Sequence, residues 1–284
     1  MKPFVYRWLL PLGIAIVLAI GLWLFVTNHI YTISGNSMYP FAGDGDLVYT
    51  EKPENIKCGD ILLVSNPLDY KSAKPRLSYS RCVASPGDKV QIYDKRLYVN
   101  DKLQQQYYSS FDVEILLLTD TEKKAAKTRY NLVDDSTKLF NTNYIITEKQ
   151  YNRIKEESIL SHIEKSVVPY YLYDSKLFPF ARQYRYNKDF YGPIIVPAKG
   201  MKIKLNAANY LFYKYLFFHS EKTKVEYKDG LFYVDGVKSE SYTFKNDYFF
   251  LLNDYLDNPS DSRTFGPVSF NDIECRVTSV FFHF

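Results

Sequence analysis

The sequence predicts a mainly β fold: an antiparallel β-sheet domain with a mixed α+β insertion, preceded by one N-terminal transmembrane helix. Three observations predict it. The 284 residues include 27 Tyr and 20 Phe, and aromatic residues at this density favour strands over helices. Short apolar runs are bounded by turns rich in Gly, Pro and Asp, which is typical of strands. A single long apolar run without charge stands near the N-terminus.

Composition also narrows the function. Hydrophobic residues make up 46% of the chain, which excludes an intrinsically disordered protein, since such chains are poor in apolar side chains. The 36 basic and 32 acidic residues leave a net charge of +4. A nucleic-acid-binding protein concentrates Lys and Arg on one face, so this near balance gives no reason to expect a nucleic-acid partner.

The three cysteines, Cys58, Cys82 and Cys275, form no CxxC or Cys/His cluster. Their odd number and wide spacing argue against a disulfide scaffold or a structural zinc site. At most one bridge can form within the chain, and the sequence leaves open whether it does. No metal or organic cofactor is implied.

Residues 8–26 form the expected anchor, with the uncharged sequence WLLPLGIAIVLAIGLWLFV. At about 1.5 Å per residue, a helix of this length spans about 28 Å, close to the hydrocarbon thickness of a bilayer. Trp8 and Trp23 lie near its ends, where aromatic rings prefer the interface. A cleaved signal peptide would have a shorter apolar core and a small-x-small site, which residues 27–31 lack. We therefore expect residues 1–29 to form an uncleaved anchor with a short N-terminal tail.

The basic residues around the anchor predict its orientation. Lys2 and Arg7 precede it, and the next basic residue is Lys52. The positive-inside rule then places the N-terminus in the cytoplasm. Residues 30–284 are expected on the periplasmic or extracytoplasmic side of the inner membrane.

Outside the membrane, we expect a β-rich core from residues 30–100 and 242–284, interrupted by an insertion at 101–241. Apolar patterning and turn signals predict strands at 46–51, 61–65, 248–252 and 274–282, and hairpins at 90–101 and 225–236, the second turning at Asp229-Gly230.

Within the insertion, Thr147-Glu148-Lys149-Gln150 is a capping-box pattern, and apolar residues at helical spacing predict a helix over 148–165. Residues 206–218 predict either a second helix capped by Asn206 or a strand, because this run is apolar on nearly all sides.

Three motifs follow the anchor in order. They are Ser34-Gly35-Asn36-Ser37-Met38-Tyr39-Pro40, Ser80-Arg81-Cys82-Val83-Ala84-Ser85-Pro86-Gly87-Asp88, and Asn253-Asp254-Tyr255-Leu256-Asp257-Asn258-Pro259-Ser260-Asp261-Ser262-Arg263. A lone Ser-Met-x-Pro sequence is weak evidence for a catalytic serine, since the hydroxyl of an arbitrary serine usually serves in a turn. The ordered set is much more specific.

This set resembles the type I signal peptidases (leader peptidases), membrane-bound serine endopeptidases of the Ser–Lys dyad type. The resemblance covers most of the chain, and residues 191–197 and 241–249 are similar to the versions of Bacteroidetes-type bacteria. It implies a signal peptidase-type β-sheet catalytic domain that is anchored to the inner membrane and lies on its periplasmic or extracytoplasmic side. It also implies removal of signal peptides from exported preproteins after small residues in an Ala-x-Ala pattern, with the substrate bound as an extended strand.

The resemblance assigns roles to the first motif. Ser37 matches the nucleophile, whose hydroxyl would attack the scissile carbonyl and form an acyl-enzyme. Gly35 stands where some members have a Ser that helps the oxyanion hole, so backbone N–H groups would supply the donors. Asn36, Met38 and Pro40 are expected around the oxyanion hole and cleft, although Met38 is equally consistent with ordinary core packing.

The other two motifs supply supporting residues in the resemblance. These supporting residues would order the catalytic centre through hydrogen bonds and ion pairs. They are Arg81, Asp88, Asp254, Asp261, Ser262 and Arg263. The chain departs from the family pattern where Asn253 replaces a Gly and Tyr255-Leu256 replaces Asn-Arg.

The largest departure is Ser80, which stands where the family has its general-base Lys, directly before Arg81. A serine hydroxyl does not accept a proton near neutral pH, and loss of a general base typically costs about 10²–10⁴ in rate. Another base would have to act. The sequence offers Lys71, Lys74 and Lys89 near the second motif, and His29, His162, His219 and His283 in unrelated segments.

Two hypotheses therefore stand. The first is a signal peptidase I-type serine endopeptidase with Ser37 as nucleophile. The second is a catalytically deficient homologue that binds signal peptides, or assembles with an active paralogue or the secretion machinery. A self-cleaving repressor of the same Ser–Lys fold is a poor match, because such proteins are soluble and carry a DNA-binding domain.

Overall fold

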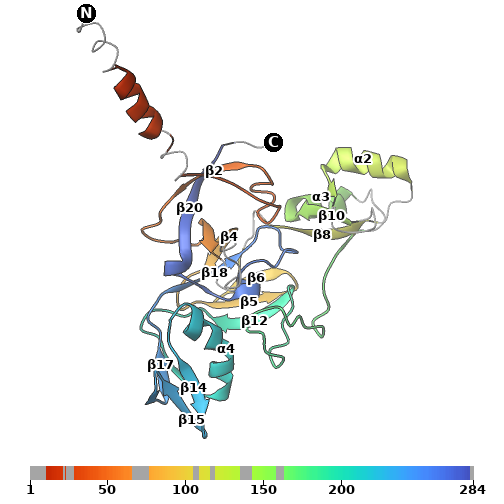
Figure 1. The fold of residues 1–284 in the computed structure, drawn as a ribbon. Coiled ribbons are helices and arrows are strands. Elements are labelled where there is room, and N and C mark those ends of the chain that lie inside the picture. Colours follow the sequence, from red (N-terminus) through yellow and green to blue (C-terminus); the bar gives the residue numbers. More distant parts are fainter. Residues whose placement is uncertain are drawn as a thin grey trace, which may run out of the picture.

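The computed structural model describes residues 11–21, 23, 29–65, 77–104, 109–115, 119–134, 143–157 and 163–281. The protein is mainly β, and its strands pair in antiparallel sheets. The largest sheet has seven strands in the order β1 (Ile30–Thr32), β2 (Leu47–Glu51), β20 (Ile273–Val280), β3 (Ile61–Ser65), β4 (Leu77–Ala84), β18 (Tyr248–Leu252) and β19 (Val268–Ser269). Strands from near the beginning and the end of the sequence therefore meet in one sheet, with β20 lying between β2 and β3 (Figure 1).

The central strands are apolar on both faces because both faces of the sheet are covered. All five residues of β18 are buried, and Leu62, Val64 and Leu251 pack on one face while Ile61 and Leu63 pack on the other. This explains why residues 61–65 and 248–252 read as continuous apolar runs rather than as alternating ones.

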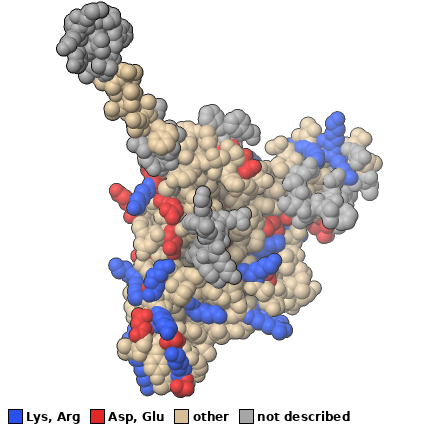
Figure 2. Space-filling model, in the orientation of Figure 1, with Lys and Arg blue, Asp and Glu red and all other residues tan. Residues whose placement is uncertain are grey.

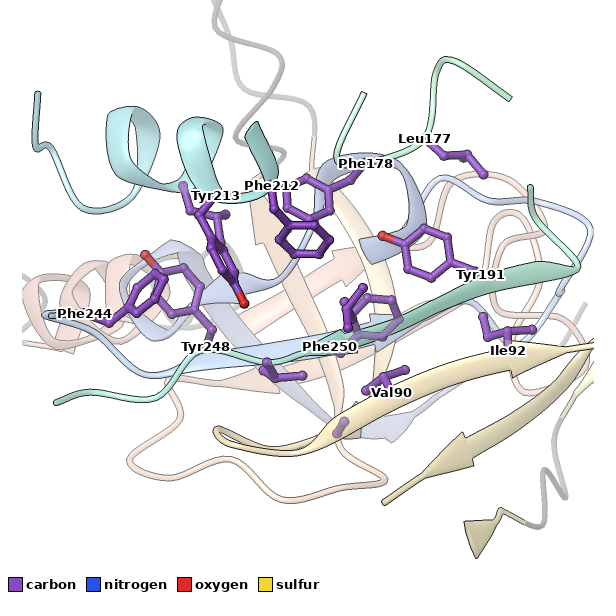
Figure 3. Packing of buried hydrophobic residues seen from close by; sticks show 14 of the residues in the cluster. Val90, Ile92, Leu177, Phe178, Tyr191, Phe212, Tyr213, Phe244, Tyr248 and Phe250 are labelled. Atoms are coloured by element: carbon purple, nitrogen blue, oxygen red, sulfur yellow. The ribbon is translucent and has the colours of Figure 1, made fainter. Parts of the chain in front are cut away.

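A second sheet has the order β12 (Phe190–Ile195), β5 (Lys89–Tyr93), β6 (Arg96–Val99) and β7 (Lys102–Leu103). β5 and β6 form the predicted hairpin, which turns at Asp94-Lys95. Between this sheet, β18 and helix α4 lies an aromatic core that includes Tyr191, Phe212 and Phe250 (Figure 3). Aromatic rings bury large apolar areas, so this core uses much of the Tyr and Phe seen in the composition.

Helix α4 (Ala207–His219) resolves the open choice at residues 206–218. The Asn206 side chain accepts a hydrogen bond from the Asn209 N–H, which is the cap that the sequence indicated. Next to it lie β13 (Lys202–Lys204) with β17 (Ser241–Thr243), and the meander β14 (Val225–Lys228), β15 (Leu231–Val234) and β16 (Val237–Lys238). The predicted turn at Asp229-Gly230 is confirmed, with positive φ at both residues.

A smaller unit contains β8 (Ser110–Ile115), α2 (Asp120–Tyr130), β9 (Val133–Asp134), β10 (Asn143–Thr147), α3 (Glu148–Glu157) and β11 (Ile163–Lys165). The capping box at Thr147 and Gln150 is present in both directions, but α3 ends at Glu157 rather than at 165. Residues 163–165 instead pair with β8, because the ladder to Val113–Ile115 is available only in the folded protein.

Helix α2 was not predicted. Only Ala126 and Tyr130 of its residues are buried, so its sequence carries almost no apolar stripe. The available signal was the capping box of Thr119 and Glu122, whose hydrogen bonds are present.

The N-terminal segment 11–21 is helical (Figure 1). The apolar side chains of Leu12, Ile14 and Val17 are exposed. Of the predicted anchor at 8–26, residues 8–10, 22 and 24–26 lie outside the described residues. Within the described part of the chain, no helix has the length and apolar character needed to cross a membrane.

Charge is spread over the surface. On the face shown in Figure 2, basic and acidic side chains are interspersed over the described residues, without a continuous basic patch.

Candidate active site

A cleft of about 360 Å³ brings parts of the first and third motifs together with the start of β4, directly before the second motif. One wall is formed by β1 and the first motif, and another by the beginning of β4. The third motif closes one side. The lining residues are Tyr31, Thr32, Ser34, Gly35, Asn36, Ser37, Leu63, Leu77, Ser78, Tyr79, Asn258 and Ser260.

Ser37 is half-buried at this cleft, and its position is set by backbone contacts. The Ser37 carbonyl accepts a hydrogen bond from the Tyr255 N–H at 3.0 Å, which links the first and third motifs. Among the described residues, the Ser37 hydroxyl has no hydrogen-bond partner. Gly35 has φ +78°, a conformation that favours glycine, and its N–H donates to Asp44 Oδ1 at 2.6 Å.

Some of the remaining residues of the first motif line the cleft, and others lie in the hydrophobic core. Asn36 lines the cleft and is exposed, and its carbonyl accepts from the Tyr39 N–H. Met38 is fully buried in a cluster with Ile33 and does not line the cleft, so of its two expected positions the structure shows the core one. Pro40 is half-buried and follows Tyr39, whose carbonyl accepts from Ser110 Oγ.

Ser80 lies at the centre of β4 and is fully buried. Its hydroxyl donates to Asn253 Oδ1 at 2.7 Å. Asn253 in turn donates through Nδ2 to the Asn258 carbonyl at 2.9 Å and through its backbone N–H to Asp261 Oδ2 at 3.0 Å. The two departures from the family pattern, Ser80 and Asn253, therefore form one neutral, buried hydrogen-bonded pair.

The residue after Ser80 forms a two-pronged ion pair. Arg81 donates from Nε and Nη2 to the two oxygens of Asp254, at 2.7 and 2.6 Å. Arg81 Nη1 also donates to the Gly59 carbonyl at 2.9 Å, and the guanidinium lies over the Phe41 ring. Burial of Asp254 raises the pKa of its carboxyl group, against the opposing effect of Arg81.

Arg263 and Asp261 form a second pair with both side chains fully buried. Arg263 donates to Asp261 from Nε at 3.0 Å and from Nη2 at 2.7 Å, and Nη1 donates to the Leu256 carbonyl at 2.7 Å. Asp261 also caps helix α5 (Ser262–Phe265), which is followed by the short 3-10 helix η1 (Phe270–Asp272). Ser262 Oγ accepts from the Leu251 N–H at 2.9 Å, which ties the third motif to β18.

Asp88 is placed in a turn away from this network. Its Oδ2 accepts from the Ser85 N–H at 2.8 Å, and Oδ1 accepts from Asn100 Nδ2 at 2.7 Å. These contacts make Asp88 a turn-forming residue of the second motif.

Sequence reasoning missed a buried cluster of four charges beside the third motif. Lys95 Nζ donates to Asp189 and to Asp257, each at 2.7 Å, and Lys188 Nζ lies against the same two carboxylates. Burial opposes the charge on Asp257, but Lys95 and Lys188 hold its pKa below the usual range. Three distant parts of the sequence contribute to this cluster, so no local motif indicated it. Only Asp257 stands inside one of the three motifs.

The unusual Tyr255-Leu256 pair also has a structural role that the motif did not reveal. The Tyr255 hydroxyl donates to Asp112 Oδ1 at 2.6 Å, and Leu256 is buried in the core of the smaller α/β unit. These two residues fasten the third motif to β8.

The other candidate bases either make contacts that do not involve Ser37 or lie outside the residues that the structure describes. Lys89 pairs with Asp101 on the surface at 2.5 Å, His29 stacks on Tyr49, and His219 lies at the end of α4 with a pKa lowered by burial. Lys71, Lys74, His162 and His283 lie outside the described residues. In the described part of the chain, no cluster of His, Cys, Asp and Glu is arranged to hold a metal ion.

The match with a known family agrees with these motifs. The family model described as "Signal peptidase, peptidase S26" matches residues 5–161, more than half of the chain. This chain belongs to the signal peptidase S26 family. The matched range includes the first two motifs and ends before the third.

Curated signal peptidases match less than half of the chain. Signal peptidase I T of Bacillus subtilis (strain 168) is 30% identical over 131 residues, which cover 43% of this chain and 60% of the relative. Signal peptidase IB of Staphylococcus aureus (strain COL) is 27% identical over 118 residues, covering 40% and 58%. The chain thus spans about 60% of the length of the curated relatives it matches.

Proposed function

We propose that this chain acts in signal-peptide processing as a serine endopeptidase of the signal peptidase I type. It binds the cleavage region of an exported preprotein as an extended strand, and Ser37 attacks the carbonyl after a small residue in an Ala-x-Ala pattern. The single observation that carries the proposal is that Ser37 and an open strand edge line the same cleft.

That open edge belongs to the first half of β4. Residues Leu77 to Arg81 of β4 pair with β3 on one side. On the other side, β18 pairs only with the second half of β4, at Arg81, Cys82 and Ala84. Within the described residues, positions 77–80 therefore have no strand on their other side. An extended peptide can add to such an edge through its main-chain hydrogen bonds.

A polar group in the cleft supports the same binding mode. Ser78 Oγ is buried and has no hydrogen-bond partner in the described structure. A buried hydroxyl without a partner is unusual in a folded protein, and a peptide main-chain group bound along β4 would satisfy it.

The proposed location is the outer face of the cytoplasmic membrane, with the N-terminus inside. The uncharged run at 8–26 and the distribution of Lys and Arg around it support a single-pass anchor. The apolar side chains exposed along residues 11–21 are consistent with a lipid environment. A membrane location also supplies the preprotein and bilayer contacts that this activity requires.

A second candidate is favoured by the Ser80–Asn253 pair: a signal-peptide-binding homologue that does not cut. A buried serine whose hydroxyl already donates to an amide oxygen cannot remove the Ser37 proton at neutral pH. Cleavage therefore requires a base from another position, with Lys71 and Lys74 as the first to test. Binding requires only the cleft and the open edge of β4.

A cleavage and binding assay separates the two candidates. The full-length chain in liposomes is given a preprotein with an Ala-x-Ala site, and Ser37→Ala is compared with the wild type. Cleavage that Ser37→Ala abolishes supports the endopeptidase, and Lys71→Ala and Lys74→Ala then identify the base. Saturable binding without cleavage supports the second candidate.

The binding arm needs a variant that blocks the cleft. Ser260 lines the cleft and is exposed, so Ser260→Trp should fill the cleft without disturbing the core. Lys238→Trp, at an exposed position in β16, is the matched control. If Ser260→Trp neither weakens binding nor slows cleavage, the cleft is not the substrate site and both candidates fail.

A further inference from the structure

Two of the three cysteines lie together next to the second motif. Cys58 is exposed in the segment before β3, and Cys82 is buried in β4. The Cys82 thiol donates to the Ala84 carbonyl at 3.7 Å, and each of the two cysteines shifts the pKa of the other. The backbone holds the two segments in register, because the Gly59 N–H donates to the Cys82 carbonyl at 2.8 Å and the Cys82 N–H donates to the Asp60 carbonyl at 2.8 Å.

The third cysteine is held elsewhere. Cys275 lies on β20, and β3 separates that strand from β4 in the sheet. Two strand spacings correspond to about 9–10 Å, whereas a disulfide requires α-carbons within about 7 Å. Cys275 also packs with Leu63 on one face of the sheet, while Cys82 packs with Leu62 on the opposite face. Cys82 therefore cannot reach Cys275, and Cys58 is the cysteine that lies beside Cys82.

The pair also has the asymmetry that thiol–disulfide exchange requires. Interaction with the Cys82 side chain lowers the pKa of Cys58 to about 6, which favours its thiolate at neutral pH. Ser85 Oγ lies 3.5 Å from the same sulfur. Interaction with the Cys58 side chain and burial raise the pKa of Cys82, which keeps it a thiol. An exposed thiolate beside a buried thiol is an attacking group with its resolving partner in place.

We propose that Cys58 and Cys82 form a disulfide by exchange with an oxidised dithiol protein. The Cys58 thiolate attacks one sulfur of the oxidant's disulfide, which forms a mixed disulfide and releases a thiolate on the oxidant. Cys82 passes its proton to that thiolate and attacks Cys58 Sγ, which breaks the mixed disulfide. The chain loses two electrons to the oxidant, whose disulfide is reduced to one thiol and one thiolate.

The bridge would act on the second motif. The Gly59 carbonyl, next to Cys58, accepts from Arg81 Nη1, and Arg81 holds Asp254 of the third motif. Linking Cys58 to Cys82 fixes the segment that supports this ion pair, one residue from Ser80. An oxidising compartment is where such bridges form, so the role in the cell rests on the proposed location outside the cytoplasm.

Disulfide mapping tests the proposal on the full-length chain in detergent. The reduced protein is equilibrated with oxidised glutathione, free thiols are alkylated, and the digest is analysed by mass spectrometry. We expect a Cys58–Cys82 peptide and an alkylated Cys275 in the wild type, and the same bridge in Cys275→Ser. We expect none in Cys58→Ser, an exposed substitution that leaves the core intact.

A second measurement, the melting temperature before and after oxidation, tests the bridge in the wild type as well as in the variants. Oxidation should raise the Tm of the wild type and of Cys275→Ser by about 5–10 °C and leave Cys58→Ser unchanged. A bridge that includes Cys275, a stable glutathione adduct on Cys58, or three alkylated thiols after oxidation would each overturn the proposal. No preprotein is used, so this outcome is separate from that of the proposed function.

Discussion

The first and second motifs place a serine in opposite environments. Ser37, which matches the nucleophile, is half-buried, and its hydroxyl has no partner in the described structure. Ser80, at the position where the family has its base, is fully buried and hydrogen-bonded to Asn253. Around Ser80 the ion pairs Arg81–Asp254 and Arg263–Asp261 are intact. The comparison teaches that the buried ion pairs of the second and third motifs form around a position that is neutral and hydrogen-bonded.

The largest expected effect comes from converting the base position. Ser80→Lys combined with Asn253→Gly should raise cleavage of an Ala-x-Ala preprotein by about 10²-fold or more, because a buried lysine then stands at the position that matches the family's general base. Ser80→Lys alone should give less, since Asn253 occupies the adjacent space. The control is Ser80→Met with Asn253→Gly, which matches the shape without the amine. Equal cleavage by the control would show that the base lies elsewhere.

The framework itself should be sensitive to loss of one partner. Arg263→Met leaves the fully buried Asp261 without its ion pair and should lower the free energy of unfolding by about 3–5 kcal/mol, measured by urea denaturation. The exposed pair of Arg153 with Glu157 gives the control, since Arg153→Met should cost less than about 1 kcal/mol. Similar losses at the two sites would contradict the view that the buried pair holds the third motif.

The charge cluster predicts a dependence on pH. The pKa of Asp257 is held below its usual value, so the carboxylate stabilises the fold at neutral pH. This contribution is lost as the pH falls below about 4 toward the folded-state pKa. Asp257→Asn should therefore flatten the acid side of the stability profile and cost about 1–3 kcal/mol at pH 7.

Asp254 is the control for this pH profile, because burial raises its pKa instead. Asp254→Asn should leave the loss of stability at acid pH in place. If urea denaturation between pH 2.5 and 7 gives the same slope for Asp257→Asn and the wild type, the cluster does not act through this carboxylate.

The smallest effect compares the two serines directly. Ser80→Ala leaves Asn253 Oδ1 buried without its donor and should cost about 1–2 kcal/mol of unfolding free energy. Ser37→Ala removes a hydroxyl that has no partner in the described residues and should stay within about 0.5 kcal/mol of the wild type. If Ser37→Ala lowered the free energy of unfolding more than Ser80→Ala, Ser37 and not Ser80 would be the serine with the structural role.

Local patterns predicted most elements and missed those that depend on the rest of the fold. The strands at 61–65 and 248–252 and the turn at Asp229-Gly230 were predicted, because apolar runs and turn residues act over a few positions. Helix α2 has only two buried residues, and residues 163–165 became a strand through pairing with β8. In the site, the motifs indicated Ser37, Arg81 and Arg263, but not Lys95 or Lys188.

The sequence by itself determined the family, the order of the three motifs and the absence of lysine at position 80, because residue identity and spacing are written in the chain. Only the tertiary structure decided that Asn253 fills the space beside Ser80, that Met38 belongs to the core, and that Cys58 lies against Cys82. The physical reason is that hydrogen bonds and burial between distant segments exist only once β4, β18 and the third motif pack together.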